Sequence, residues 1–450
     1  MTTYIEALFH QSFAYYAVVA LFVVLLAEAA SKSRELRWLY ACFVYLTICL
    51  WYLIDPVYRS GEYAYVSNED FTLAFVQVGI FLVVFRGLFE LVLPPTPTRS
   101  LRAFDPRMLD HAGVTKVVVI AWLALLAIGM YRVNFQFRAA LFPIEGRHIW
   151  GTHMWARPRI GGAFSFLVSV ADYTYMFICS MFGMIAVATL RPNVRRWMIA
   201  LMLLTWPMFV LEGSRHKVLI VAMPAAFSLL LLKSWSRQKQ ITFVVVSLLV
   251  VNFLMLIAVT YRNVGYAEYF TSERDRKMTH FGLNMTEELM YLNRYQQHGA
   301  MDVEWGYNYF ANAVNLVPRV LWPGKPQVGM KYAALRVGMY RGQTAATISH
   351  GIIGQGVTNF GRWLGPAAPA IILLAFGYWV CRLPEQGMPF LRACLVLACF
   401  TALPNFGRDI TLFTFWPVIF GTLGIFAYER YFADPRVFAS PVEHSREHVV

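Results

Sequence analysis

The sequence predicts an all-α polytopic membrane protein with about 11 transmembrane helices, and three observations carry this prediction. Of the 450 residues, 58% are hydrophobic and 14% are charged, whereas a typical soluble domain carries about 25% charged residues. Apolar runs recur that match the ~20 residues a helix needs to cross a bilayer. The connections between these runs alternate in basic character. We therefore expect one integral membrane domain over residues 1–450.

The expected spans follow the apolar runs in chain order. The first run has no basic segment before it and no small-residue cleavage site after it, so we expect it to stay as a helix and not to be a cleaved signal peptide. The cores of the spans cover residues 13–30, 38–54, 71–93, 114–131, 163–189, 197–211, 217–232, 241–260, 364–381, 390–404 and 411–429.

Basic residues set the expected orientation. They cluster after the first, third, fifth, seventh, ninth and eleventh spans. Short basic loops stay in the cytoplasm, which places the C-terminus inside and the N-terminus outside. Two outer connections, 132–161 and 261–363, are nevertheless rich in arginine, and this excess of positive charge calls for a reason.

The outer loop 261–363 is expected to be partly helical. It has few Ser or Gly runs, and Pro318 and Pro323 fix an irregular segment within it. Apolar residues at helical spacing predict amphipathic helices on the outer membrane face, either interfacial or packed on the bundle. They are Met285, Leu289 and Leu292, followed by Phe310, Val314 and Val317.

Several classes of function are not indicated. The net charge of +13 fits cytoplasmic loops and anionic headgroups, and no nucleic-acid motif is present. There is no phosphate-binding glycine loop, and the histidines lack metal-ligand spacing, so we expect no metal and no cofactor. The six cysteines lie in or beside apolar runs and are expected to be small buried hydrophobes.

Cation-rich turns at the outer ends of spans are the candidate site. LEGSRHKVLI, residues 211–220, brings Glu212, Arg215, His216 and Lys217 between two apolar runs. Each such turn is interpretable as a snorkelling anchor or helix cap, but five at one membrane level favour a shared anion site. The others supply Arg408 and Asp409 in NFGRDI, Arg319 and Lys325 in NLVPRVLWPGKP, His350, Asn359 and Arg362 in ISHGIIGQGVTNFGRW, and Arg262 after Tyr261.

A lipid diphosphate is the anion that fits such a site. Arginine binds phosphate oxygens with two donors, while lysine acts as a point charge. If the diphosphate leaves, the same cations stabilise its developing charge. A base must then take the proton of an incoming hydroxyl, and the candidates in order are His350, Asp409 and Glu212. Asp172, an intramembrane acid, is equally interpretable as a site residue or as a partner in an interhelical hydrogen bond.

The turn GSRHKVL, the segment VPRVLWPGKP and the following SHGIIGQGVTNFG together resemble the Wzy-type polymerases of bacterial oligosaccharide repeat units. The motifs cover residues 200–410, and the hydropathy pattern covers the whole chain. The proline-tryptophan segment with the glycine-rich stretch after it is the most specific part.

The resemblance implies a membrane glycosyltransferase of GT-C-like architecture in the bacterial inner membrane, with a periplasmic N-terminus and a cytoplasmic C-terminus. It implies inverting, metal-independent transfer of a glycan from undecaprenyl diphosphate to the next lipid-linked repeat unit. A chain-length regulator and a flippase of the same pathway are the implied partners. Under this reading Arg215, Arg319 and Arg408 bind the diphosphate, Arg262 and Lys325 support them, and His350 or Asp409 activates the acceptor hydroxyl.

Two alternatives remain open at the level of sequence. An O-antigen ligase-like enzyme shares the architecture and the donor but transfers the glycan to a lipid A core. A polysaccharide or lipid transporter would carry more polar groups along the middle of its spans, where only Asp172 and Arg86 are charged. The connection 132–161 does not map onto the family pattern, and its Arg159 is a supporting candidate, as are Asp172, Asn359 and Arg362.

Overall fold

In the computed structural model the described residues form helices joined by turns and loops, and no strand occurs among them. It divides into two compact units. The first comprises 1–98, 278–382 and 402–414, and the second comprises 99–277, 383–401 and 415–450. The described residues are 12–33, 35–58, 67–95, 113–143, 154–155, 165–212, 215–232, 284–314, 317–326, 329–337, 348–385, 388–408 and 412–432, with short pieces between 235 and 250.

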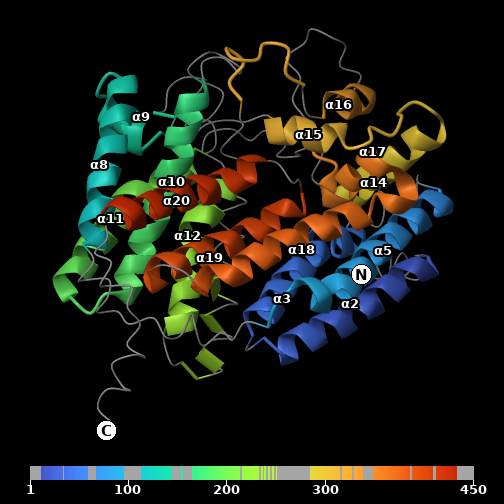
Figure 1. The fold of residues 1–450 in the computed structure, drawn as a ribbon, viewed down its shortest axis with the longest axis horizontal. Coiled ribbons are helices and arrows are strands. Elements are labelled where there is room, and N and C mark those ends of the chain that lie inside the picture. The colour runs from blue at the N-terminus through green and yellow to red at the C-terminus, as the bar shows by residue number, and fades with distance from the viewer. Residues whose placement is uncertain are drawn as a thin grey trace, which may run out of the picture. The chain divides into compact units, whose positions relative to one another are not determined.

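The first unit is built around α5 (Asn68–Val92), a 25-residue helix with Ser67 as its N-cap. In Figure 1, α2 and α3 lie beside α5 at the blue end of the colour range, and α18 packs along the same bundle. The other elements of this unit are α2 (Phe13–Ser31), α3 (Leu36–Ile48), the π-helical turn η1 (Cys49–Leu53), α4 (Asp55–Tyr58), α14 (Met285–Gln297), α15 (Tyr307–Val314), α16 (Met330–Val337), α17 (Gly351–Leu364) and α18 (Ala367–Arg382).

Aromatic side chains at helical spacing hold α5 in the bundle. Phe81, Phe85 and Phe89 are fully buried. Phe85 meets Tyr45 of α3 edge-on, with ring centroids 5.7 Å apart, and Phe89 packs on Trp38 at 4.6 Å. Lipid solvates apolar side chains about as well as protein does, so helices in a membrane associate mainly through close packing. These aromatic contacts therefore fix the register of α5 against α3.

The glycine-rich helix α17 packs closely on the turn that leads into α18. A Cβ on Gly356 would overlap the carbonyl of Gly365, and a Cβ on Gly365 would overlap the backbone of Val357. The helix is interrupted at Gly361, whose φ of +79° suits glycine. The glycine-rich stretch before the ninth expected span therefore lets the backbone around Gly356 and the backbone around Gly365 lie in direct contact.

Polar side chains anchor α17 and α14 beside the middle of α5. Gln77 and Asn293 exchange two side-chain hydrogen bonds, of 2.9 and 2.8 Å, and both residues are fully buried. Gln77 also donates to the carbonyl of Arg362 at 2.9 Å. Gln77 is the tenth residue of α5, about 14 Å from the helix start at 1.5 Å per residue. The end of α17 is therefore placed well along a membrane-spanning helix.

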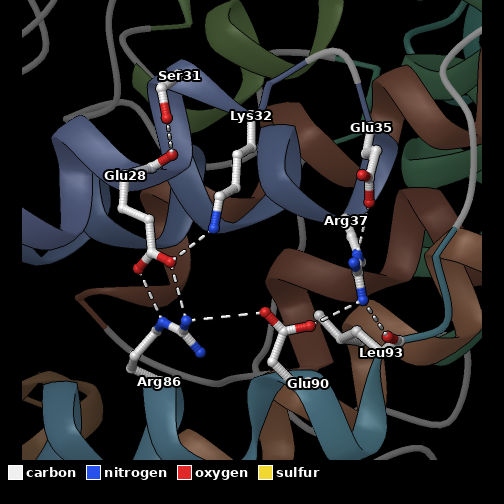
Figure 2. A network of polar contacts seen from close by, with 8 residues as sticks. All are labelled: Glu28, Ser31, Lys32, Glu35, Arg37, Arg86, Glu90 and Leu93. Atoms are coloured by element: carbon white, nitrogen blue, oxygen red, sulfur yellow. Dashed lines mark hydrogen bonds and ion pairs between the residues drawn. The ribbon is translucent and has the colours of Figure 1, made fainter.

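A network of ion pairs joins α2, α3 and α5 at one end (Figure 2). Arg86 donates to both carboxylate oxygens of Glu28 at 2.9 Å, and Lys32 reaches the same carboxylate. Arg37 bridges Glu35 and Glu90. Arg86 lies six residues before the end of α5, and its charge is paired with Glu28. Its depth within the span stays a prediction.

The second unit is centred on α10 (Ser165–Ala188), which packs against α8, α11 and α12. Gly183 approaches Ala225 of α12 closely, and Gly421 of α20 lies against Phe177, so small residues set the helix spacing. The elements of this unit are α8 (Val114–Arg132), α9 (Phe137–Leu141), α10, α11 (Pro192–Leu211), α12 (Arg215–Leu232), η3 (Leu383–Glu385), α19 (Pro389–Phe406, whose residues from 402 belong to the first unit) and α20 (Leu412–Tyr431, whose residues up to 414 belong to the first unit).

Helices lie over every expected span except 241–260, which falls largely outside the described residues. Among the described residues, six helices are long and apolar enough to cross a membrane. The chain is therefore a helical membrane protein, while the total of 11 spans and their orientation stay predictions. The six are Phe13–Ser31, Leu36–Leu53, Asn68–Val92, Val114–Arg132, Phe166–Ala188 and Pro192–Leu211.

Candidate functional site

Buried polar side chains gather in two places, one in each unit. In the second unit, Lys217 forms ion pairs with Asp172 and Glu212. Its Nζ lies 2.9 Å from both carboxylate oxygens of Asp172 and 2.9 Å from the Glu212 carboxylate. Lys217, Asp172 and Glu212 are 4%, 3% and 4% exposed. We refer to these three residues as the ion triad.

The turn between α11 and α12 explains the geometry of the ion triad. Helix α11 ends at Leu211, and Glu212 follows as its C-cap, donating its N–H to the carbonyl of Met208 at 2.8 Å. Helix α12 begins at Arg215, and Lys217 lies in its first turn. Asp172 is the eighth residue of α10. Three helices thus contribute one charged residue each near the turn that separates two of them.

Asp172 forms the interhelical bond that one of its two interpretations expected, and its candidacy as a site residue stays a prediction. Lys217 was not among the predicted site residues. The sequence did indicate that Asp172 has a cationic partner, because a buried acid in an apolar helix needs one. The turn after α11 offers three candidates for this partner. Glu212, predicted as a candidate base, is bound to Lys217 here. Arg215 is the first residue of α12, and its side chain lies outside the described set.

In the first unit, the carboxylate of Glu288 in α14 is fully buried and binds two side chains of α16. The hydroxyl of Tyr332 donates to this carboxylate, and Nε of Arg336 lies 3.2 Å from it. Arg336 also donates to Glu287 at 2.7 Å and lies over the ring of Tyr291. Burial and the Glu288 charge raise the pKa of Tyr332 well above its usual range, so Tyr332 is a hydrogen-bond donor at neutral pH.

His350 lies directly against this cluster. Its ring is 4.9 Å from the ring of Tyr332, its Nε2 is 3.2 Å from Oγ1 of Thr358, and it is 3% exposed. Burial lowers the pKa of His350 to about 4, with the backbone of Ile348 opposing the shift in part. The imidazole is therefore neutral at pH 7, which a proton acceptor requires, but it is enclosed by protein.

Two of the predicted cation-rich turns meet in the first unit. The carbonyl of Gly407 accepts a hydrogen bond from the N–H of Ile352 at 3.1 Å. Gly407 precedes Arg408, which is half-buried, and Ile352 follows His350 by two residues. Trp51 fixes the same end of α19 by donating to the carbonyl of Pro404 at 2.5 Å. The segments NFGRDI and SHGIIGQG are thus brought together, although 58 positions separate His350 from Arg408.

The side chains of Arg319 and Lys325 both hydrogen-bond to backbone carbonyls of their own segment. Arg319 donates to the carbonyl of Pro323 at 3.2 Å, and Lys325 donates to that of Val317 at 2.8 Å. Lys325 is 8% exposed. Burial and the charge of Arg319 lower the pKa of Lys325. These contacts give Lys325 a role in shaping the loop, and its expected support of a diphosphate stays a prediction.

Asn359 and Arg362 have structural contacts in the described residues. The side-chain oxygen of Asn359 accepts from the backbone N–H groups of Asn308 and Tyr309, at 3.1 and 3.4 Å, and so caps the first turn of α15. Arg362 contributes its carbonyl to Gln77. The remaining candidates, Arg159, Arg262 and Asp409, lie outside the described residues.

Within the described ranges, no group of three or more His, Cys, Asp or Glu residues is arranged to hold a metal ion. Comparison with protein-family models, with curated proteins and with solved structures gives no match for this chain. An assignment of function therefore depends on its own residues.

Proposed function

We propose that this protein is a membrane glycosyltransferase that polymerises oligosaccharide repeat units carried on undecaprenyl diphosphate, on the outer side of the bacterial inner membrane. The motifs in LEGSRHKVLI, NLVPRVLWPGKP and SHGIIGQGVTNFG support this activity by resemblance. The helices long and apolar enough to cross a membrane give the chain the setting that a lipid-linked donor needs.

The observation that carries the proposal is the contact between the segments of Arg408 and His350, through Gly407 and Ile352. It supports the proposal because it brings the chain segments that carry Arg408 and the neutral imidazole of His350 together in one unit. In the proposed site Arg408 binds the diphosphate and neutralises the charge that develops as it leaves. Asp409, directly after Arg408, and His350 are the two proposed bases.

The proposed reaction exchanges one glycosidic bond for another. The hydroxyl oxygen at the non-reducing end of an acceptor repeat unit attacks the anomeric carbon of the donor glycan. The bond from that carbon to the diphosphate oxygen breaks, and undecaprenyl diphosphate leaves with the electron pair. The hydroxyl proton passes to the base, and the configuration at the anomeric carbon inverts.

The test uses the full chain in nanodiscs with purified lipid-linked repeat units as the only substrate. A ladder of longer glycans is expected for the unchanged protein, and Arg408→Ala is expected to lose at least 100-fold in rate, about 3 kcal/mol of transition-state stabilisation. Arg215→Ala should be similarly impaired if the resemblance at GSRHKVL holds. Arg196→Ala, an exposed position at the start of α11, is the matched control and should keep the ladder.

Two outcomes overturn the proposal. Glycan transfer that occurs only when lipid A core is added identifies a ligase. Movement of lipid-linked glycan between leaflets with no new bond identifies a transporter. Asp409→Asn and His350→Gln separate the two proposed bases, because only the replacement of the base removes activity while the protein remains folded.

A further inference from the structure

Helix α15 has its polar and apolar faces reversed relative to a helix on a water-soluble surface. Asn308 and Asn312 point inward and are 3% and 6% exposed, and they hydrogen-bond to each other at 3.3 Å. The outward face presents Tyr307 and Phe310, which are 53% and 50% exposed. Phe310, expected to be either interfacial or packed on the bundle, is therefore not packed inside the protein. The two asparagines can be inside because their side chains hydrogen-bond to each other, and the side chain of Asn359 accepts from the backbone N–H of Asn308.

The same apolar surface continues beyond the helix. Phe310 meets Trp322 edge-on, with ring centroids 6.4 Å apart. Val320 and Leu321, just before Trp322, are 61% and 77% exposed. We refer to Trp305, Tyr307, Phe310, Val320, Leu321 and Trp322 as the aromatic surface.

The charged side chains near the aromatic surface bind backbone carbonyls and are not exposed on it. Lys325 is buried and donates to the carbonyl of Val317, and Arg319 is half-buried and donates to that of Pro323. Between residues 305 and 326, every described residue that is exposed is aromatic, aliphatic, proline or glycine. Single exposed apolar residues are ordinary, but a contiguous apolar surface without charge indicates an apolar partner.

Backbone strain at one end supports a specific role for the aromatic surface. Trp305 has a φ of +47° and is 77% exposed. A bulky residue in this region costs on the order of 1–3 kcal/mol and persists only where its neighbours enforce it. Glu304 enforces it here, since its N–H donates to Thr358 and its carbonyl accepts from Tyr307. The fold thus tolerates strain to keep this indole outside.

The position of the aromatic surface indicates its partner. Tyr309 of α15 packs on Phe360 of α17, with ring centroids 6.2 Å apart. Helix α17 in turn ends beside Gln77, well along the spanning helix α5. The next residues of α17, Trp363 and Leu364, are 63% and 71% exposed. The aromatic surface is therefore tied to a segment that lies within the depth of a span.

We propose that the aromatic surface inserts into the lipid interface of the leaflet that surrounds the N-terminal half of α5. Tryptophan and tyrosine favour this zone because their rings are apolar and their N–H and O–H groups still reach water. Lipid also solvates the exposed apolar side chains of the spanning helices in this unit, such as Val83 of α5 at 59%. The inference is independent of the enzymatic activity proposed above.

The experiment measures the surroundings of single spin labels on the full chain in nanodiscs. Phe310→Cys and Leu321→Cys carry the label on the aromatic surface, in a background in which the half-buried Cys49 is replaced by serine. Gln297→Cys, at the last residue of α14, and Asp302→Cys, five residues beyond it, are the controls at exposed positions in the same unit. Collision rates with oxygen, which concentrates in lipid, are compared with those of a water-soluble nickel chelate.

We expect the ratio of oxygen to nickel collisions at Phe310 and Leu321 to exceed that at the controls several-fold. A control-like ratio at both positions means that water covers the surface and overturns the proposal. Low collision rates with both reagents mean that protein covers it, for example a second copy of the chain, and also overturn the proposal. Leu321 lies outside any helix, so its variant keeps the test valid if Phe310→Cys perturbs α15.

Discussion

The ammonium of Lys217 lies 2.9 Å from each carboxylate oxygen of Asp172, and this pair joins the first turn of α12 to α10. Removing one partner of a buried ion pair costs about 3–5 kcal/mol, since the other charge is left without compensation. Lys217→Met is expected to reach this range, because it leaves Asp172 and Glu212 facing each other. Thermal unfolding in detergent, followed by tryptophan fluorescence, measures the loss.

Asp172→Asn is the matched comparison for Lys217→Met. It keeps the ion pair between Lys217 and Glu212 and replaces a charged hydrogen-bond acceptor with a neutral one, so a loss of about 1–2 kcal/mol is expected. Equal destabilisation by the two variants would contradict the shared role of Lys217.

The ion pairs of α16 allow a comparison of buried and exposed positions on one helix. Arg336→Ala leaves the fully buried Glu288 without its cation, and we expect a loss of about 3–5 kcal/mol. Lys331→Ala removes an exposed pair with Asp302, which is worth about 0–1 kcal/mol. Chemical unfolding of the two variants in the same detergent checks the order, and a larger effect for Lys331 would refute it.

The acid stability of the protein should depend on His350. In the unfolded chain its imidazole is protonated near pH 6.5, but in the folded protein its pKa is about 4. Between these values the unfolded state binds more protons, so stability falls as the pH is lowered from 6.5 towards 4, by about 3 kcal/mol in total. At neutral pH this penalty is absent.

The measurement is the midpoint of thermal unfolding between pH 7.5 and pH 4.5. His350→Gln is expected to flatten the acid dependence relative to the unchanged protein, whatever its stability at pH 7.5. His298→Gln, at an exposed position after α14, should leave the dependence unchanged. An acid dependence in His350→Gln that matches the unchanged protein would disprove the assignment.

Gly356→Ala should disrupt the turn between α17 and α18. Its Cβ would overlap the carbonyl of Gly365, a backbone atom that has no rotamer to adjust. We expect a loss of about 1–3 kcal/mol from overpacking. Gly87→Ala in α5 is the control, because nothing lies within 4 Å of its Cβ, and a gain of about 0.4–1 kcal/mol is expected there. Thermal unfolding of both variants checks the opposite signs.

Local patterns were sufficient to place the helices but not to pair their side chains. Apolar runs located α10 and α12 to within a few residues, because span length and hydropathy are properties of a continuous stretch. The same patterns marked Asp172 and the charged turn after α11. They did not show that Lys217 faces Asp172, because that depends on the rotation of α12 relative to α10, which neighbouring residues in sequence do not determine.

Apolar spacing in the loop 261–363 marked amphipathic helices but left open whether their apolar faces meet lipid or protein. The periodicity of Met285, Leu289 and Leu292 coincides with the buried face of α14, while Phe310 of α15 lies on an exposed face. A hydrophobic stripe indicates which face avoids water, and in a membrane protein that face can meet lipid as readily as protein. The buried asparagines were the missing signal, because the bond between Asn308 and Asn312 and the bond from the Asn308 N–H to Asn359 are visible only in three dimensions.

The reversed polarity of α15 has a practical consequence for work with the isolated protein. A fragment cut from the loop would present Trp305, Leu321 and Trp322 to buffer, with Lys325 and Arg319 folded away from the surface that solubility requires. Such a fragment is expected to self-associate, and antibodies raised against it would select a face that native vesicles cover. Binders for this region are better selected against the whole chain in a lipid disc.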